Sequence, residues 1–457
     1  MACGKSLCQS GGCHKYDEEV DKQTPLTATR GLINGNLCVK CKASTAVAGG
    51  AGGGEDGRFC ADCFRGSLFG KFRLAVTSNG MISPSDKVLV AFSGGPSSRV
   101  ALQFVREMQD KALKNFEASR DKPLPVFGVG VAFIDEHSAL SLPPEDGDEV
   151  VEHIKTIVSD LAPPGKELHV TPLGSLYSSH LTDGRSKLKE LLDAVPDDTG
   201  KEDLLTYLRM LCLQKVAVEN GYSKLVLGSC TSTIARHVIS ATVKGQGYSL
   251  PADIQYVDAR WEVPVLLPLR DCLAQELNVL CQLDGLGRLK TLAASDGPRS
   301  GINALVSSFI SLLQEENPSR ECTIVRTAGK LTPFSFDRLP DVDDPKARLA
   351  SQRRQKKFNI KSDESTLPES FCSLCNSPLH KSDFPRLINY ANDQHSADVF
   401  DASFCSSCRF QILPSDSSSM EYFYSLLPQP MIAGSKISSY HDRRLLRQVI
   451  SNLIFCF

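Results

Sequence analysis

Eight of the 17 cysteines in this chain fall into four Cys-x-x-Cys pairs, a spacing that supplies thiolates to a metal ion. The first two pairs form Cys-x2-Cys-x18-Cys-x2-Cys and the last two form Cys-x2-Cys-x29-Cys-x2-Cys. Because four thiolates close a tetrahedral Zn²⁺ shell, the sequence predicts one zinc-ribbon module near each end of the chain. The predicted ligands are Cys38, Cys41, Cys60, Cys63, Cys372, Cys375, Cys405 and Cys408.

Other interpretations of these cysteines stay open. A redox Cys-x-x-Cys would need a thioredoxin-like βαβ context, which neither end of the sequence suggests. His380 and His395 lie inside the second motif and could replace a thiolate, or they could lie on surface loops. The residues Cys3, Cys8, Cys13 and His14 could form a third site, or they could belong to a flexible tail.

A second feature that could take part in chemistry is the loop SGGPSS at 93–98, which follows an apolar run and precedes a helical pattern. Small residues between a strand and a helix let backbone N–H groups approach a phosphate, and the helix dipole adds positive charge. The candidate phosphate-binding residues are Ser93, Gly94, Gly95, Ser97 and Ser98. The alternative is that the two glycines only make a tight turn.

The elements that must position this loop are predicted to be alternating strands and helices. Short apolar runs are separated by helical patterns, which predicts an α/β fold with a doubly wound, mainly parallel sheet. The expected strands are 87–92, 126–134, 167–173, 224–228 and 264–269. One expected helix follows the first strand with Val100, Phe104, Met108 and Ala112 on its packing face, and another follows the fourth strand with Ile234, Val238 and Thr242 on its packing face. A third helix, over about 201–220, is expected to end at Asn220-Gly221.

Composition limits the class of protein. The 457 residues carry 51 Lys plus Arg against 53 Asp plus Glu, a formal net charge of −2, so the chain is not a globally basic nucleic-acid binder. No apolar run reaches the length of a membrane span, and the N-terminal sequence lacks the apolar core of a secretion signal. These features predict a cytoplasmic protein. We expect a flexible tail over 1–35, a zinc ribbon over 36–80, the α/β domain over 81–340, a charged linker over 341–370, and a second ribbon-like module with a terminal helix over 371–457.

A resemblance to a known family rests on the first strand, the loop SGG-x-x-S that follows it, and the stretch LGSCTSTIARHVISATVKG at 227–245. In these stretches the chain resembles the PP-loop ATP pyrophosphatases that modify tRNA, which have the adenine nucleotide alpha hydrolase-like fold. With the ribbon CVKC…FCADCF and the following GKFR, the chain resembles the family of cytoplasmic tRNA 2-thiolation protein 2 over about residues 36–457. The resemblance implies a non-catalytic subunit that forms a heterodimer with a catalytic PP-loop paralogue. It also implies 2-thiolation of the wobble uridine, as 5-methoxycarbonylmethyl-2-thiouridine, in tRNA Lys, Glu and Gln, with sulfur from a thiocarboxylated ubiquitin-related modifier.

The departures from the PP-loop pattern concern its acidic and cysteine positions. Pro96 and Ser97 stand where the family has Lys and Asp. In the second motif Cys230, Ser232, Thr233 and Arg236 replace an amide and carboxylates, and 202–208 lacks the Cys-x-x-Cys of catalytic relatives. Because Mg²⁺ bound with a nucleotide needs carboxylates, we expect no catalytic residue here and doubt that ATP binds. Cys212 and Cys230 are expected to be buried apolar groups.

A basic run could contact tRNA phosphates, which would make binding salt-sensitive. Its cations are Lys346, Arg348, Arg353, Arg354, Lys356, Lys357 and Lys361. The alternatives are a solvated linker and a nuclear-import-like pattern. Two other functions also stay open: a self-sufficient ATP-dependent tRNA sulfurtransferase, and a zinc-ribbon interaction protein unrelated to RNA.

Overall fold

The computed structural model describes residues 37–49, 58–118, 125–137, 144–160, 166–177, 181–286, 301–317, 319–332, 371–379 and 404–434. Several predicted features lie outside these residues: the tail with Cys3, Cys8, Cys13 and His14, the histidines His380 and His395, the basic run from Lys346 to Lys361, and the proposed terminal helix.

The centre of the described chain is a six-stranded sheet with the order β5-β4-β3-β6-β8-β7. All neighbouring strands are parallel except β7 and β8, which pair antiparallel. The strands are β3 (Lys87–Ala91), β4 (Gly128–Asp135), β5 (Glu167–Pro172), β6 (Lys224–Val226), β7 (Val257–Asp258) and β8 (Val265–Leu266). The predicted α/β class and the five predicted strands are therefore confirmed, and β7 is an addition.

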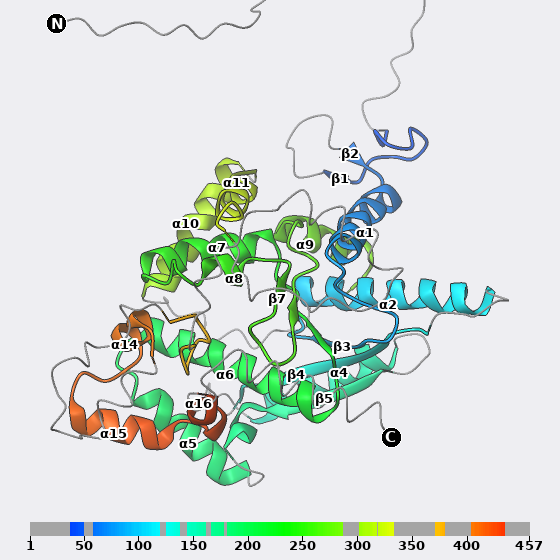
Figure 1. The fold of residues 1–457 in the computed structure, drawn as a ribbon. Coiled ribbons are helices and arrows are strands. Elements are labelled where there is room, and N and C mark those ends of the chain that lie inside the picture. Colours follow the sequence, from blue (N-terminus) through cyan, green and yellow to red (C-terminus); the bar gives the residue numbers. More distant parts are fainter. Residues whose placement is uncertain are drawn as a thin grey trace, which may run out of the picture. The chain divides into compact units, whose positions relative to one another are not determined.

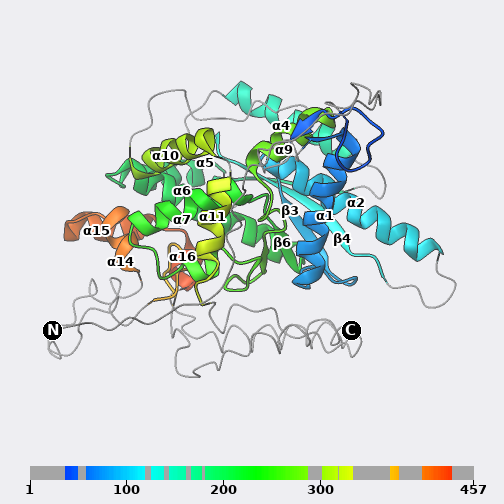
Figure 2. The same cartoon turned by 90° about the horizontal axis from the view of Figure 1, so that it is seen from above.

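Helices cover both faces of the sheet because successive strand residues point to opposite sides (Figure 1). Leu89 packs with the helices on one face, whereas its neighbours Val88 and Val90 pack with those on the other. The Val88 face is covered by α1 (Ala61–Ser78), α2 (Pro96–Ala118), α4 (Pro144–Ser159) and α9 (Ala274–Leu283). The Leu89 face is covered by α5 (Leu181–Asp193), α6 (Asp198–Glu219), α7 (Thr231–Val243) and α8 (Leu250–Asp253), and α10 (Ile302–Glu316) and α11 (Ser319–Ala328) pack against α7 (Figure 2). The sheet is thus doubly wound.

The sequence patterns explain these helices with one exception. Val100 and Phe104 are fully buried on α2, and Met108 and Ala112 pack beside them, as expected. Helix α6 begins after Asp197, whose carboxylate accepts a hydrogen bond from the Gly200 N–H, and its end is followed by Gly221 at φ 66°. On α7 the prediction for Thr242 is wrong: Thr242 is exposed, and Ala241 continues the buried stripe instead.

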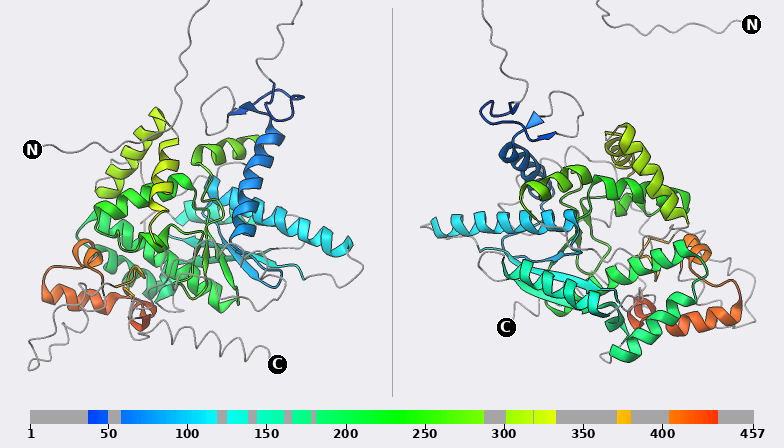
Figure 3. Two further views of the ribbon diagram at one scale, coloured as in Figure 1. Left: turned by 45° about the horizontal axis from the view of Figure 1, so that its top comes forward. Right: turned by 180° about the vertical axis from the view of Figure 1, so that it is seen from behind.

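The two cysteine-rich segments adjoin different parts of this core. The first carries a short hairpin, β1 (Ala48–Gly49) and β2 (Arg58–Phe59), and leads directly into α1. The second ends within α14 (Ser406–Gln411), which contains Cys408 and is followed by α15 (Ser417–Leu426) and α16 (Gln429–Gly434). Both views in Figure 3 place α15 next to α5, and its side chains belong to the same hydrophobic cluster as α6. No helix in the described part of the chain is both long and apolar enough to cross a membrane.

Candidate metal centres and pocket

A pocket of about 640 Å³ lies at the carboxyl edge of β3, β4 and β6, where the loop 93–98 was expected to act. This edge is where open α/β sheets bind ligands. The loop, the end of β4, one face of α6 and the segment 227–229 all contribute to its wall. The structure thus brings Ser93, Gly95, Ser97 and Ser98 to one cavity, while Gly94 forms the turn at φ 78°.

The loop is held closed by its own hydrogen bonds. The Ser98 hydroxyl is buried and donates to the Gly95 carbonyl over 2.9 Å. The Ser98 hydroxyl oxygen also accepts hydrogen bonds from the Ser93 N–H at 3.3 Å and from the Ser93 hydroxyl at 3.2 Å. The Ser93 N–H and the Ser98 hydroxyl, two groups that could meet a phosphate, therefore already have partners inside the loop.

Gly228 brings the second predicted motif against this loop. A Cβ built on Gly228 would lie 2.8 Å from the Ser98 nitrogen and 2.9 Å from the Ser97 carbonyl carbon. Real side chains do not approach backbone so closely, so the position requires glycine. This contact packs the start of the 227–245 stretch directly against the loop 93–98.

An ion pair closes the pocket on the side of β4 and α6. Arg209 on α6 binds both carboxylate oxygens of Glu136, with Nη2 2.9 Å from Oε2 and Nε bonded to Oε1. Burial lowers the pKa of Arg209, but the paired carboxylate outweighs it and the net effect is to raise that pKa. The pair was not predicted from the sequence, although Glu136 directly follows β4, at the edge of the sheet where ligands bind.

The remaining wall of the pocket is mostly apolar. Among the described residues that line the pocket, Glu136 is the one carboxylate, and no Asp, Cys, Lys or His is present. Cys212 and Cys230 lie elsewhere and are buried, and burial raises the pKa of Cys212 to about 11. Ser232 donates a hydrogen bond to the buried Glu321. These placements give no pair of free carboxylates for Mg²⁺ and no reactive thiolate.

The first predicted metal centre is assembled as expected. One sulfur from each of Cys38, Cys41, Cys60 and Cys63 lies within 4.8 Å of the others. A tetrahedral ion with Zn–S bonds of about 2.3 Å holds its sulfurs about 3.8 Å apart. The Cys41 and Cys60 sulfurs are 3.8 Å apart, so the four thiols fit one tetrahedral ion rather than two disulfides. Burial raises the pKa of Cys38, yet backbone N–H groups outweigh it and lower that pKa to about 6, which suits a metal-binding thiolate.

The second predicted metal centre repeats this geometry. The sulfurs of Cys372, Cys375, Cys405 and Cys408 also lie within 4.8 Å of one another, with Cys375 and Cys405 3.7 Å apart. Residues just after the second cysteine, Lys42 in the first centre and Asn376 in the second, both adopt positive φ, 57° and 55°. The third cysteine precedes a helix in both, α1 and α14. The two centres therefore share the same local backbone arrangement.

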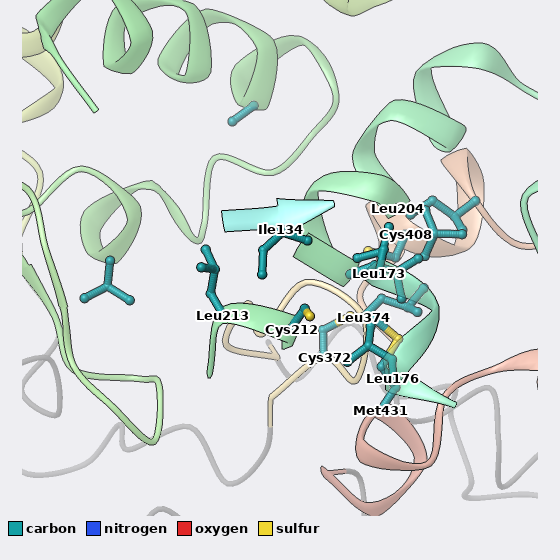
Figure 4. Close-up of a cluster of buried hydrophobic side chains, with 14 of the residues drawn as sticks. Ile134, Leu173, Leu176, Leu204, Cys212, Leu213, Cys372, Leu374, Cys408 and Met431 are labelled. Carbon is teal, nitrogen blue, oxygen red and sulfur yellow. The ribbon is translucent and has the colours of Figure 1, made fainter. Parts of the chain in front are cut away.

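The centres differ in their surroundings. Cys41 of the first is exposed and Cys63 is half-buried. In the second, Cys372 and Cys408 lie in the large hydrophobic cluster that also contains α5 and α6 (Figure 4). The second centre is thus part of the core rather than an attachment to it.

Comparison with known proteins gives close relatives at the level of sequence. The chain is 57% identical to cytoplasmic tRNA 2-thiolation protein 2 of Arabidopsis thaliana over 457 residues, covering 99% of this chain and 98% of that protein. It is 53% identical to the protein of that name from Oryza sativa subsp. indica, over 91% of this chain and 88% of the relative. The bovine protein of that name is 28% identical, over 64% of this chain and 68% of the relative. No family model matches the chain.

Among solved structures, a U34-tRNA thiolase from Methanococcus maripaludis with its [4Fe-4S] cluster aligns with a TM-score of 0.49 and 16% identity, over 68% of this chain and 93% of that chain.

Proposed function

Since the chain belongs to the cytoplasmic tRNA 2-thiolation protein 2 family, we propose that it is a supporting, non-catalytic subunit for 2-thiolation of the wobble uridine in tRNA Lys, Glu and Gln. The observation that carries the non-catalytic part is the lining of the pocket. Its loop satisfies its own hydrogen bonds, its one described carboxylate is bound by Arg209, and no described thiol faces it. Activation of a uridine oxygen by ATP needs a metal-binding carboxylate, and sulfur transfer needs a thiolate.

The chemistry must then come from a partner. We propose a heterodimer with a catalytic PP-loop paralogue, which adenylates the uridine and receives sulfur from a thiocarboxylated ubiquitin-related modifier. The chain's nearly neutral net charge of −2 supports a shared tRNA-binding task rather than an independent one. The cations between Lys346 and Lys361 are the proposed tRNA contact of this chain. The relatives are named as cytoplasmic proteins, and we propose the cytoplasm as the location of this chain as well.

We further propose that both four-cysteine centres hold Zn²⁺. Sulfur separations of 3.8 and 3.7 Å support a single tetrahedral ion in each. Bound zinc would supply a fixed, redox-inert cross-link between segments distant in sequence. The first centre would hold residues 38–41 beside the start of α1, and the second would hold residues 372–375 beside the start of α14.

The test is mass spectrometry of bulk tRNA nucleosides from cells that lack this protein. Deletion should remove the 2-thio group from wobble uridine, and the wild-type gene should restore it. Cys38→Ser should restore it poorly while the protein remains detectable. Unchanged thiolation in the deletion cells would reject the proposal and favour an interaction protein unrelated to RNA.

One observation favours a second candidate, an ATP-dependent sulfurtransferase in its own right: the pocket keeps about 640 Å³ at the edge where nucleotides bind. That function requires the purified chain to release pyrophosphate from ATP in the presence of tRNA, and Gly95→Asp to abolish the release. A folded chain that releases none would exclude it.

A further inference from the structure

Helix α6 contributes side chains to the pocket on one face and to the hydrophobic cluster around the second four-cysteine centre on the other. Thr206, Arg209, Met210 and Leu213 line the pocket. Leu204 and Leu208 point away from it and are fully buried in the cluster that holds the second four-cysteine centre. Since residues three and four apart share a helix face, one rigid helix separates the pocket from the metal centre. Any shift of α6 on one side must therefore appear on the other.

The metal centre packs closely against this helix. Figure 4 shows Cys372, Cys408 and Leu374 among Leu173, Leu176 and Leu204, with Cys212, Leu213 and Ile134 continuing the cluster toward the pocket. At the start of α6 a Cβ on Gly200 would lie 2.1 Å from the carbonyl oxygen of Gln411, the last residue of α14. Backbone thus meets backbone, and α14 contains the ligand Cys408.

Two polar side chains of the core also reach the centre. The Arg260 guanidinium donates from Nη1 to the Asn376 carbonyl at 3.4 Å, directly after the ligand Cys375, and Arg260 is itself held by Asp258 and Asp253. Tyr207 lies on α6, and its hydroxyl accepts from the Gln246 amide at 3.2 Å. Tyr207 packs against the hydrophobic cluster that contains Cys372, Cys405 and Cys408, and burial raises the pKa of its hydroxyl well above its usual range.

The first four-cysteine centre lacks these connections. Its helix α1 packs on α2 and α9, and its ligands Cys60 and Cys63 lie at the start of that helix. None of its four cysteines belongs to the hydrophobic cluster that contains α6, whereas Cys372, Cys405 and Cys408 of the second centre do. It therefore provides an internal control in the same chain.

We propose that the metal of the C-terminal four-cysteine centre fixes the position of α6 and thereby of the Arg209–Glu136 wall of the pocket, with Tyr207 and Arg260 as positioning residues. The inference rests on the proposed occupancy of the centre by zinc. The N-terminal metal leaves α6 unchanged. The C-terminal centre is in this sense a structural part of the pocket, although its ligands follow the sheet in sequence by more than a hundred residues.

The test compares amide hydrogen exchange of the full chain in Cys408→Ser and Cys63→Ser, with metal content measured for each. Cys408→Ser should speed exchange along 198–219 at least tenfold, whereas Cys63→Ser should speed it only within 37–49 and 58–64. Equal exchange of α6 in the two variants would overturn the proposal. The single tryptophan, Trp261, follows Arg260 in sequence, so its emission should shift in Cys408→Ser and stay constant in Cys63→Ser.

A second arm covers failure of Cys408→Ser to fold. In the Cys63→Ser chain, a chelator removes the remaining metal, and α6 exchange should rise in step with that loss. Tyr207→Phe keeps all ligands and the ring, so it should still bind one metal there but release it to the chelator about tenfold faster. Metal loss without a change in α6, or unchanged release from Tyr207→Phe, would contradict the coupling. Absence of metal from the wild-type chain would instead overturn the zinc proposal itself, and the coupling with it.

Discussion

Replacing Gly200 with alanine should destabilise the protein, although alanine is the better helix former. Gly200 lies in the first turn of α6, where alanine alone would add up to about 1 kcal/mol of stability. The new Cβ would lie 2.1 Å from the Gln411 oxygen and 3.0 Å from the Val195 Cγ1. An ordinary carbon–oxygen contact needs about 3.3 Å, so α14 must move by about 1 Å. Such overpacking costs about 1–3 kcal/mol, and because the backbone partner cannot rotate away we expect a cost of about 2–3 kcal/mol, which leaves a net loss of about 1–2 kcal/mol.

Gly66→Ala is the matched control for this change. Gly66 is also inside a helix, α1, and a Cβ there would meet nothing within 4 Å. It should stabilise the chain by about 0.5–1 kcal/mol. Thermal and denaturant unfolding of both variants measure whether each change raises or lowers the free energy of unfolding. The metal content of Gly200→Ala shows whether its C-terminal centre binds metal less tightly. Stabilisation by Gly200→Ala equal to that by Gly66→Ala would refute the close contact between α6 and α14.

Three further outcomes are expected. Gly130→Ala should destabilise by about 1–3 kcal/mol because its Cβ would lie 1.9 Å from the Tyr222 hydroxyl oxygen. Gly128→Ala on the same strand should change unfolding little, because its nearest neighbour is the flexible Lys87 Cγ at 3.3 Å and the Lys87 Cα lies at an ordinary 3.8 Å. Burial raises the pKa of Asp253, but the Arg260 charge outweighs it and holds that pKa well below its usual range, so this pairing contributes stability above about pH 4 that is lost on acidification. Arg260→Met should therefore cost about 3–5 kcal/mol at pH 7 and less near pH 3, as denaturant unfolding at the two pH values would measure. Elemental analysis of the purified chain should find about two zinc ions, and a single ion would reject one of the two centres.

The sheet could be predicted because each buried strand carries a continuous apolar run, as in Val88 to Val90. Strand β7 could not, since it has two residues and its only support is pairing with β8. The last residue of the α7 packing stripe was predicted one position too late, because Thr242 continues the four-residue spacing from Val238, whereas three-residue spacing leads to Ala241.

The grouping of the eight cysteines was predictable from their Cys-x-x-Cys spacing, and the structure brings each set of four sulfurs close enough together to hold a metal ion. The closed state of the loop was not predictable, since it depends on where the Ser98 hydroxyl points. The contact of the second centre with α6 was also not predictable, because the charged stretch over 341–370 indicated a linker and hence a separate C-terminal module. The domain bounds remain a prediction.

The central claim is that this chain supports thiolation without performing it, and tRNA nucleoside mass spectrometry of deletion cells complemented with Gly95→Asp tests it most directly. A Cβ on Gly95 would lie 3.6 Å from the Ser93 oxygen, an ordinary contact, so the fold should accept the change, while the added carboxylate would repel any phosphate at the loop. The account predicts 2-thiouridine at the wild-type level. Loss of 2-thiouridine, with protein abundance and metal content intact, would contradict it.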